Sequence, residues 1–180
     1  MRYRRSFFIG IGTAAVALVS IPSIADAQNA GAPLLLPSGQ ILMLSNQAVL
    51  YTPTGSPKSS WAPTITTAPS SISSGQTYQV SGTQFGGMGQ GISFGDEYQN
   101  ATNYPLVRIT NKSSGKVVYA RTHGISSMGV QTGNATITTS FDVPSGIGSG
   151  ASTLVVVTNG IASTPVSVTV SAKRSAHRIR

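Results

Sequence analysis

The strongest constraint on the fold is a series of short segments in which every second residue is apolar. In residues 166–170 three valines alternate with Ser167 and Thr169, and Tyr78 and Val80 alternate with polar residues in the same way. A period of two places the apolar side chains on one face of a β-strand. Seven strand-like segments follow one another along the chain: 64–67, 76–82, 106–110, 116–121, 136–141, 153–158 and 165–171. About seven short strands in such a length predict a β-sandwich.

The composition supports an all-β fold without disulfides. Only 9% of the residues are charged, whereas serine, threonine and glycine are abundant, which suits short strands and turns rather than helices. The pairs Asn159-Gly160 and Ser114-Gly115 stand between strand-like segments and predict hairpin turns. Because the chain has no cysteine, the fold depends on its apolar core, and thiol chemistry is excluded.

Three further apolar segments precede the sandwich, at 34–36, 41–44 and 48–51. Pro-Ser-Gly-Gln at 37–40 separates the first two and Thr-Pro-Thr-Gly at 52–55 follows the third, so we expect a three-stranded meander. A sheet this small has little core and needs a surface to pack against. Residues 56–63 predict a linker, and we expect Trp61, its one large apolar residue, to tuck onto the sandwich.

The first 27 residues have the three parts of a secretory signal peptide. Arginines occupy positions 2, 4 and 5, residues 7–21 are almost wholly apolar, and Ala25-Asp26-Ala27 offers a small-x-small cleavage site. We therefore expect cleavage after Ala27 and a secreted, periplasmic or cell-envelope protein. An apolar run of about fifteen residues is too short to span a bilayer, so we expect no membrane span after cleavage. The adjacent Arg4 and Arg5 leave both the general and the twin-arginine export routes open.

The formal charge of +8 is concentrated at the two ends of the chain. Three arginines belong to the signal segment, and four basic residues lie in the tail at 172–180. Between 28 and 171, five basic residues and three acidic residues leave a net charge of +2. This nearly neutral body predicts no nucleic-acid partner. The tail is either a solvated terminus or a contact with anionic polymers of the envelope.

Several stretches resemble a known family. Gly-Gln-Thr-Tyr-Gln-Val-Ser-Gly-Thr-Gln-Phe at 75–85 resembles the opening hairpin of early-set Ig-like domains of the IPT/TIG type. Residues 64–170 resemble the C-terminal domain that follows Kelch propellers in bacterial galactose-oxidase-like proteins, on the stretches at 95–97, 103–111 and 119–123. Residues 34–55 then resemble the end of a last propeller blade. The resemblance implies four parts: the signal peptide 1–27, a blade remnant with its linker 28–63, an Ig-like sandwich 64–171 and a basic tail 172–180.

The same resemblance raises the question of a copper oxidase. In the galactose-oxidase-like family a Thr-His pair of this domain helps to bind copper beside two tyrosines and a second histidine, and Thr122-His123 occupies the similar stretch. This chain lacks the propeller that supplies the other ligands, the downstream Gln-Arg and the cysteine of the cysteine-tyrosine cofactor. His123, Asp142 and a serine could form a triad on paper, but no nucleophile elbow is present. We therefore expect no enzyme activity and no copper, with His123 satisfying backbone groups at a strand end.

A second candidate metal site lies between the predicted strands. Asp96 and Glu97, with Asn100 and Asn103 nearby, offer the oxygen ligands that calcium prefers. The alternative is a polar loop closed by its own side-chain hydrogen bonds. Asp96, Glu97 and His123 are thus the candidate metal ligands of the chain.

Three classes of function remain. The sandwich fold and the absence of an assembled catalytic site favour a non-catalytic interaction or structural module at the cell surface. The first alternative is binding of carbohydrate or of a cell-wall polymer, which needs exposed aromatic residues. The candidates for this role are Trp61, Tyr98, Tyr104 and Tyr119. The second alternative is a fragment or accessory domain of a galactose-oxidase-like copper oxidase. The expected partner is a cell-surface polymer or protein.

Overall fold

The computed structural model describes residues 33–44, 48–88 and 104–171. Apart from one 3-10 turn at Ser59–Trp61 (η1), all regular elements in these residues are β-strands. The prediction of an all-β fold is therefore confirmed. Within the same ranges, no helix has the length and apolar character needed to cross a membrane.

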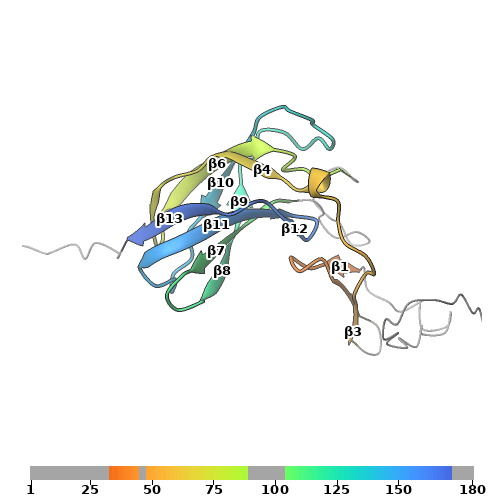
Figure 1. The fold of residues 1–180 in the computed structure, drawn as a ribbon, viewed down its shortest axis with the longest axis horizontal. Coiled ribbons are helices and arrows are strands. Elements are labelled where there is room, and N and C mark those ends of the chain that lie inside the picture. Colours follow the sequence, from red (N-terminus) through yellow and green to blue (C-terminus); the bar gives the residue numbers. More distant parts are fainter. Residues whose placement is uncertain (1–32, 45–47, 89–103, 172–180) are drawn as a thin grey trace, which may run out of the picture.

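Two sheets form a sandwich (Figure 1). The first sheet has the order β4 (Thr64–Thr67), β6 (Thr77–Thr83), β10 (Ile137–Asp142) and β9 (Thr122–His123). The second has the order β5 (Ser71–Ser73), β13 (Val166–Ser171), β11 (Gly150–Thr158), β7 (Leu106–Asn111) and β8 (Val117–Ala120). A short strand, β12 (Ile161–Ala162), pairs with β11.

The strand order is that of an immunoglobulin-like sandwich. If β4, β6, β7, β9, β10, β11 and β13 are lettered A to G, then A, B, E and D make one sheet while C, F and G lie in the other, as in Ig domains. Among the described strand pairs only β5 with β13 is parallel, and it places residues 71–73 beside residues 169–171. The prediction of an Ig-like sandwich of about seven strands is confirmed.

Seven strands of the sandwich lie within three residues of the bounds predicted from the sequence: β4, β6, β7, β8, β10, β11 and β13. Three other strands were not predicted, and one of them, β9, is strand D of the Ig-like order. These are β5, β9 and β12, which have two or three residues each. Such short strands cannot display a period of two, and only pairing with a neighbouring strand makes them extended.

The core lies between the two sheets, where the inward side chains of both meet. The rings of Tyr78 and Phe141 lie with centroids 6.1 Å apart at its edge. The largest fully buried apolar side chains are Phe85, Phe141, Ile72, Ile109 and Leu154. Each such side chain contributes about 1.5–3 kcal/mol when it leaves water, which allows a sandwich without disulfides to be stable.

The three-stranded meander is present as β1 (Leu34–Leu35), β2 (Ile41–Leu44) and β3 (Ala48–Tyr51). Its register places Leu34, Leu42 and Leu50 on one face. Leu35, Ile41 and Tyr51 share the other face. Both faces are therefore apolar, yet none of the nine strand residues whose burial is described is buried.

The turn between β1 and β2 packs against the hairpin between β11 and β12. A Cβ on Gly160 would lie 2.2 Å from Gly39 Cα, so the two backbones touch where neither residue has a side chain. Asn159 and Gly160 have φ values of 52° and 75°, which identifies the two-residue turn predicted from the sequence. The meander thus lies at the β12 end of the sandwich (Figure 1).

Candidate ligand-binding site

Of the three predicted metal ligands, only His123 falls in the described residues. Its Nε2 lies 3.1 Å from Asp142 Oδ1, so the imidazole is held by a carboxylate rather than by the backbone groups that the sequence analysis expected. Asp96 and Glu97, together with Asn100, Asn103 and Tyr98, lie in residues 89–103, outside the described part. In the described ranges, no three His, Cys, Asp or Glu side chains come together as a metal site would require.

His123 and Asp142 belong to a small polar cluster on the outer face of the first sheet. Thr77 Oγ1 donates a 2.7 Å hydrogen bond to Asp142 Oδ1, and Arg121 Nη2 lies 3.5 Å from Asp142 Oδ2. The hydrogen bonds from Thr77 and then from His123 lower the pKa of Asp142 below its usual 3.8. The imidazole is 44% exposed and the carboxylate 41%, so this surface cluster lacks the enclosure of a catalytic site.

A different site is marked by backbone conformation. Within the described residues, three amino acids other than glycine have positive φ: Gln84 at 59°, Gln131 at 49° and Asn159 at 52°. All three carry a side-chain amide. Asn159 takes this conformation as the first residue of its hairpin turn, whereas at Gln84 and Gln131 it costs about 1–2 kcal/mol each. Residues strained in this way concentrate at functional sites. They lie in the loop after β6, the loop between β9 and β10, and the β11–β12 turn.

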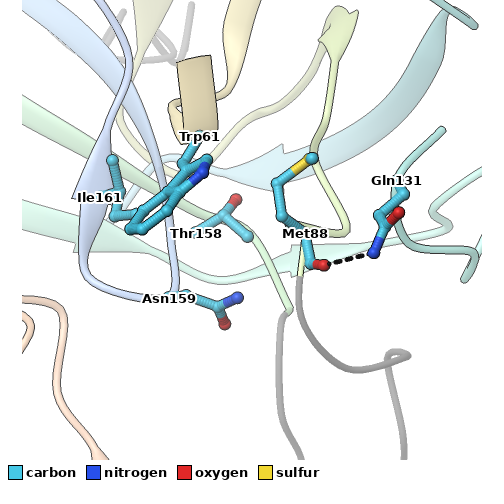
Figure 2. Close-up of a pocket in the computed structure, with 7 residues that line it drawn as sticks. Trp61, Met88, Gln131, Thr158, Asn159 and Ile161 are labelled. Carbon is cyan, nitrogen blue, oxygen red and sulfur yellow. Dashed lines mark hydrogen bonds between the residues drawn. The ribbon is translucent and has the colours of Figure 1, made fainter. Parts of the chain in front are cut away.

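Hydrogen bonds and close contacts hold these three loops together. Gln131 donates from its backbone N to Gly87 O at 3.0 Å and from Nε2 to Met88 O at 2.9 Å (Figure 2). Thr158 Oγ1 donates to Phe85 O at 3.1 Å, which ties the end of β11 to the loop after β6. A Cβ on Gly87 would lie 2.6 Å from Asn159 Nδ2, so only glycine fits there without a shift.

The same loops contain polar atoms that lack partners. Three buried side-chain oxygens of the described residues accept and donate no hydrogen bond: Gln84 Oε1, Thr132 Oγ1 and Asn159 Oδ1. An unsatisfied buried polar group costs about 1–3 kcal/mol, and each case in a native protein needs an explanation. Strain and unmet hydrogen-bonding capacity therefore occur in the same small region of the sandwich.

These loops open onto a hollow of about 460 Å³ that is bordered by Trp61. Its lining is Trp61, Gly87, Met88, Gln131, Thr158, Asn159 and Ile161 (Figure 2). A second hollow, also of about 460 Å³, shares Trp61, Asn159 and Ile161 and is closed by the meander segments 38–40 and 52–57. We call the two together the Trp61 groove. No charged side chain lines it within the described part of the chain.

Trp61 is held at the groove by the 3-10 turn η1. Its backbone N donates to Lys58 O at 2.9 Å, and Lys58 Nζ lies over the indole at 5.6 Å from the ring centroid. The linker tryptophan lines the same hollow as Asn159 and Ile161 of the sandwich, and 40% of its surface is exposed. The indole of Trp61 has the Lys58 ammonium over its ring and is still partly exposed to solvent, so it can contact a ligand.

Of the other predicted aromatic candidates, the described Tyr104 and Tyr119 do not line this groove. Tyr119 lies on β8 opposite Arg108, on the outer face of the second sheet. Tyr104 precedes β7 and is only partly exposed. The sequence analysis singled out Trp61 and the Asn159-Gly160 turn, but it missed Gln84 and Gln131. An amide residue next to a loop glycine, as in Asn159-Gly160, was the only sequence signal available for this site.

Comparison with known proteins identifies no family. No family model and no curated protein matches the chain. The filamin domain of Lin-41 is similar in structure, with 11% sequence identity, coverage of 61% of this chain and 91% of that chain, and a TM-score of 0.33. Domains 4 and 5 of the S-layer protein SbsC give 12% identity, 84% and 81% coverage, and a TM-score of 0.26. These values are too low to support an argument about function, and the Ig-like fold is assigned here from the strand order.

Proposed function

We propose that the chain is an exported, non-catalytic Ig-like module that binds its ligand in the Trp61 groove. One observation carries the proposal. Three loops that include Gln84 and Gln131, both in the left-handed conformation, meet beside an exposed tryptophan and border a hollow of about 460 Å³. Gln131 lines this hollow, and residues held in strained backbone conformations concentrate at ligand-binding sites.

The chemistry of the groove supports binding rather than catalysis. Among the described residues, its lining contains no carboxylate, imidazole or amine that could act as general acid or base at neutral pH. It offers an indole, a thioether and amides, which recognise a ligand by contact area and hydrogen bonds. Export is supported by the features of residues 1–27, and a secreted module is the setting in which a polymer or protein of the cell surface becomes the partner.

The test is retention of the full chain on insoluble polymers: peptidoglycan, chitin and cellulose. We expect saturable retention on at least one of them, with loss in Trp61→Ala. The matched control is Tyr119→Ala, which removes an equally exposed aromatic from another face of the sandwich. Equal retention of both variants, or no retention on any polymer, would refute the proposed groove.

We also propose two more specific assignments, one for the domain type and one for a calcium site. The meander has apolar residues on both faces, as sheets that are covered on both sides do. This pattern supports the proposed blade remnant within residues 28–63, followed by an IPT/TIG-type domain at 64–171. Asp96 and Glu97 remain proposed calcium ligands on the chemistry of their oxygens. Calcium titration of the full chain, with Asp96→Asn as the variant, tests the latter: an unchanged heat of binding would exclude it.

A further inference from the structure

We infer that the edge strand β8 pairs with the same strand of a second copy of the chain, which joins the second sheets of two sandwiches around a two-fold axis. This surface is separate from the Trp61 groove, since no residue of β8 lines either of its hollows. The inference therefore goes beyond the proposed function. It follows from the unprotected character of β8, from its unpaired backbone groups and from the pairing that its exposed side chains allow.

The ends of the two sheets differ in how well they are protected against a further strand. The edge strands of the described sandwich are β4 and β9 in the first sheet and β5 and β8 in the second. A bulge between Ile65 and Thr67 interrupts β4, and β5 and β9 have only three and two residues, all features that hinder edge-to-edge pairing. In contrast, β8 has four residues, an unbroken register with β7 and neither charge nor proline. Of these four edges, β8 is therefore the most open to a partner strand.

The backbone of β8 presents unpaired groups on its free side. Asn111 N donates to Lys116 O at 2.9 Å, so the carbonyl of Lys116 points to β7. Because the direction of these groups alternates along a strand, the N–H and C=O groups of Val117 and Tyr119 point away from β7. They make no hydrogen bond to any other residue that the structure describes. Two donors and two acceptors are thus free to pair with another strand.

The residues with free backbone groups also carry the exposed side chains of β8. Val117 is 47% and Tyr119 is 41% exposed on the outer face of the sheet, whereas Val118 packs against the core. If Val117 of one copy lies opposite Tyr119 of the other in an antiparallel pair, all four free groups of each strand form hydrogen bonds. Each valine then packs against a tyrosine, and aromatic side chains paired with β-branched ones across strands stabilise a sheet.

The sequence around β8 selects this register. A shift of one residue would place the exposed side chains of one copy opposite the core-facing side chains of the other. A shift of two residues in one direction would place Val117 opposite Arg121, and in the other direction Tyr119 opposite Gly115 of the turn. Only the register that pairs Val117 with Tyr119 gives both exposed residues an apolar partner.

The small size of the contact predicts a reversible dimer. One edge strand of four residues buries less than the roughly 1,600 Å² of a standard interface, so the dissociation constant should be weaker than about 1 µM. Two identical strands suit this contact because an antiparallel edge is its own complement under a two-fold axis. Lys116 would lie opposite Ala120 of the other copy, so the register sets no like charges directly against each other.

Sedimentation velocity of the full chain over about three decades of concentration tests the dimer. We expect the sedimentation coefficient to rise with concentration to the value of a dimer. Val117→Lys should raise the dissociation constant at least about tenfold, because the ammonium would lose hydration beside the tyrosine of the other copy. The matched control is Thr110→Lys, which adds the same charge next to Val117 but on β7, one strand away from the edge. It should leave the dissociation constant nearly unchanged at physiological salt.

Disulfide cross-linking tests the register. Since the chain has no cysteine, Val118→Cys introduces a single thiol, and the proposed axis places the two copies of residue 118 opposite each other. Residues opposite each other in a non-hydrogen-bonded pair have Cα atoms about 4.5 Å apart, within reach of a disulfide. With oxidised glutathione, Val118→Cys should form a linked dimer at least about tenfold faster than Leu50→Cys, whose thiol lies on the exposed apolar strand β3.

The outcomes decide the inference without touching the proposed function, because retention on polymers is measured far below the concentration at which the dimer forms. A chain that stays monomeric at the highest concentration would overturn the inference. A dimer that is unchanged in Val117→Lys, or equally weakened in Thr110→Lys, would do the same. Faster cross-linking of Leu50→Cys than of Val118→Cys would place the contact on the meander instead. Melting curves show whether each variant is folded, and the cross-linking rates decide alone if Val117→Lys is not.

Discussion

Three glycine-to-alanine substitutions separate the cost of backbone conformation from the cost of close packing around the groove. Gly133 has a φ of +57° and open space where a Cβ would stand. Gly87 has a φ of +74°, and its Cβ would lie 2.6 Å from Asn159 Nδ2 and 3.3 Å from Thr158 Cγ2. Gly82 has no positive φ, but its Cβ would lie 1.8 Å from Thr64 O, a backbone atom of the neighbouring strand.

The free energy of unfolding should fall by a different amount in each variant. Gly133→Ala should lose about 1 kcal/mol, because only the left-handed φ is penalised. Gly87→Ala should lose about 2 kcal/mol, since the methyl group must also displace the end of the Asn159 side chain. Gly82→Ala should lose about 3 kcal/mol or more, because β4 itself has to move.

Urea unfolding followed by circular dichroism measures these values, provided that the m-value stays constant. Retention on the insoluble polymer that the full chain binds supplies a second measurement: Gly87→Ala should weaken binding and Gly133→Ala should not. If Gly87→Ala and Gly133→Ala were equal in stability and in binding, the close approach of Gly87 to Asn159 would be wrong. The groove would then lack the contact that holds the loop after β6 against the β11–β12 turn.

Three further predictions concern the surface cluster and the first residues of the chain. In NMR titration, Thr77→Val should raise the pKa of Asp142, because the Thr77 hydrogen bond is the largest single cause of its depression. Since that pKa is lowered by folding, the carboxylate stabilises the protein above its unfolded pKa, and this contribution should disappear as the pH falls through the folded value. Metal analysis of the purified full chain should find no stoichiometric copper, and one tight site that vanishes in His123→Ala would contradict this. The intact mass of exported protein should correspond to a chain that starts at Gln28, and a mass that retains residues 1–27 would exclude cleavage after Ala27.

The main strands were predictable because their local pattern and their final environment agree. In β13, Val168 and Val170 are buried while Ser167 and Thr169 are exposed, as the alternation of the sequence requires. Thr122 and His123 show no such pattern, and they form β9 only because β10 lies beside them. Sequence patterns thus predict strands that are long enough to show the alternation of apolar and polar residues. Shorter segments become strands only through pairing with a neighbouring strand.

The groove was predictable only in pieces. Trp61 and the Asn159-Gly160 turn were expected where they are found, since a lone tryptophan in a linker and an Asn-Gly pair carry local signals. The meeting of Gly87, Gln131 and Asn159 depends on contacts between loops far apart in the sequence, and no local pattern encodes it. The hydrogen bond between His123 and Asp142 has the same origin, because it depends on the pairing of β9 with β10.

The parallel pairing of β5 with β13 has a consequence for when the domain can be completed. Residues 71–73 form an edge strand of the second sheet, but the strand that pairs with them, residues 169–171, is synthesised almost one hundred residues later. Until then the side chain of Ile72, fully buried in the finished core, has no sheet to join. The sandwich therefore cannot close progressively from its first strand, and its folding should be slow and nearly all-or-none.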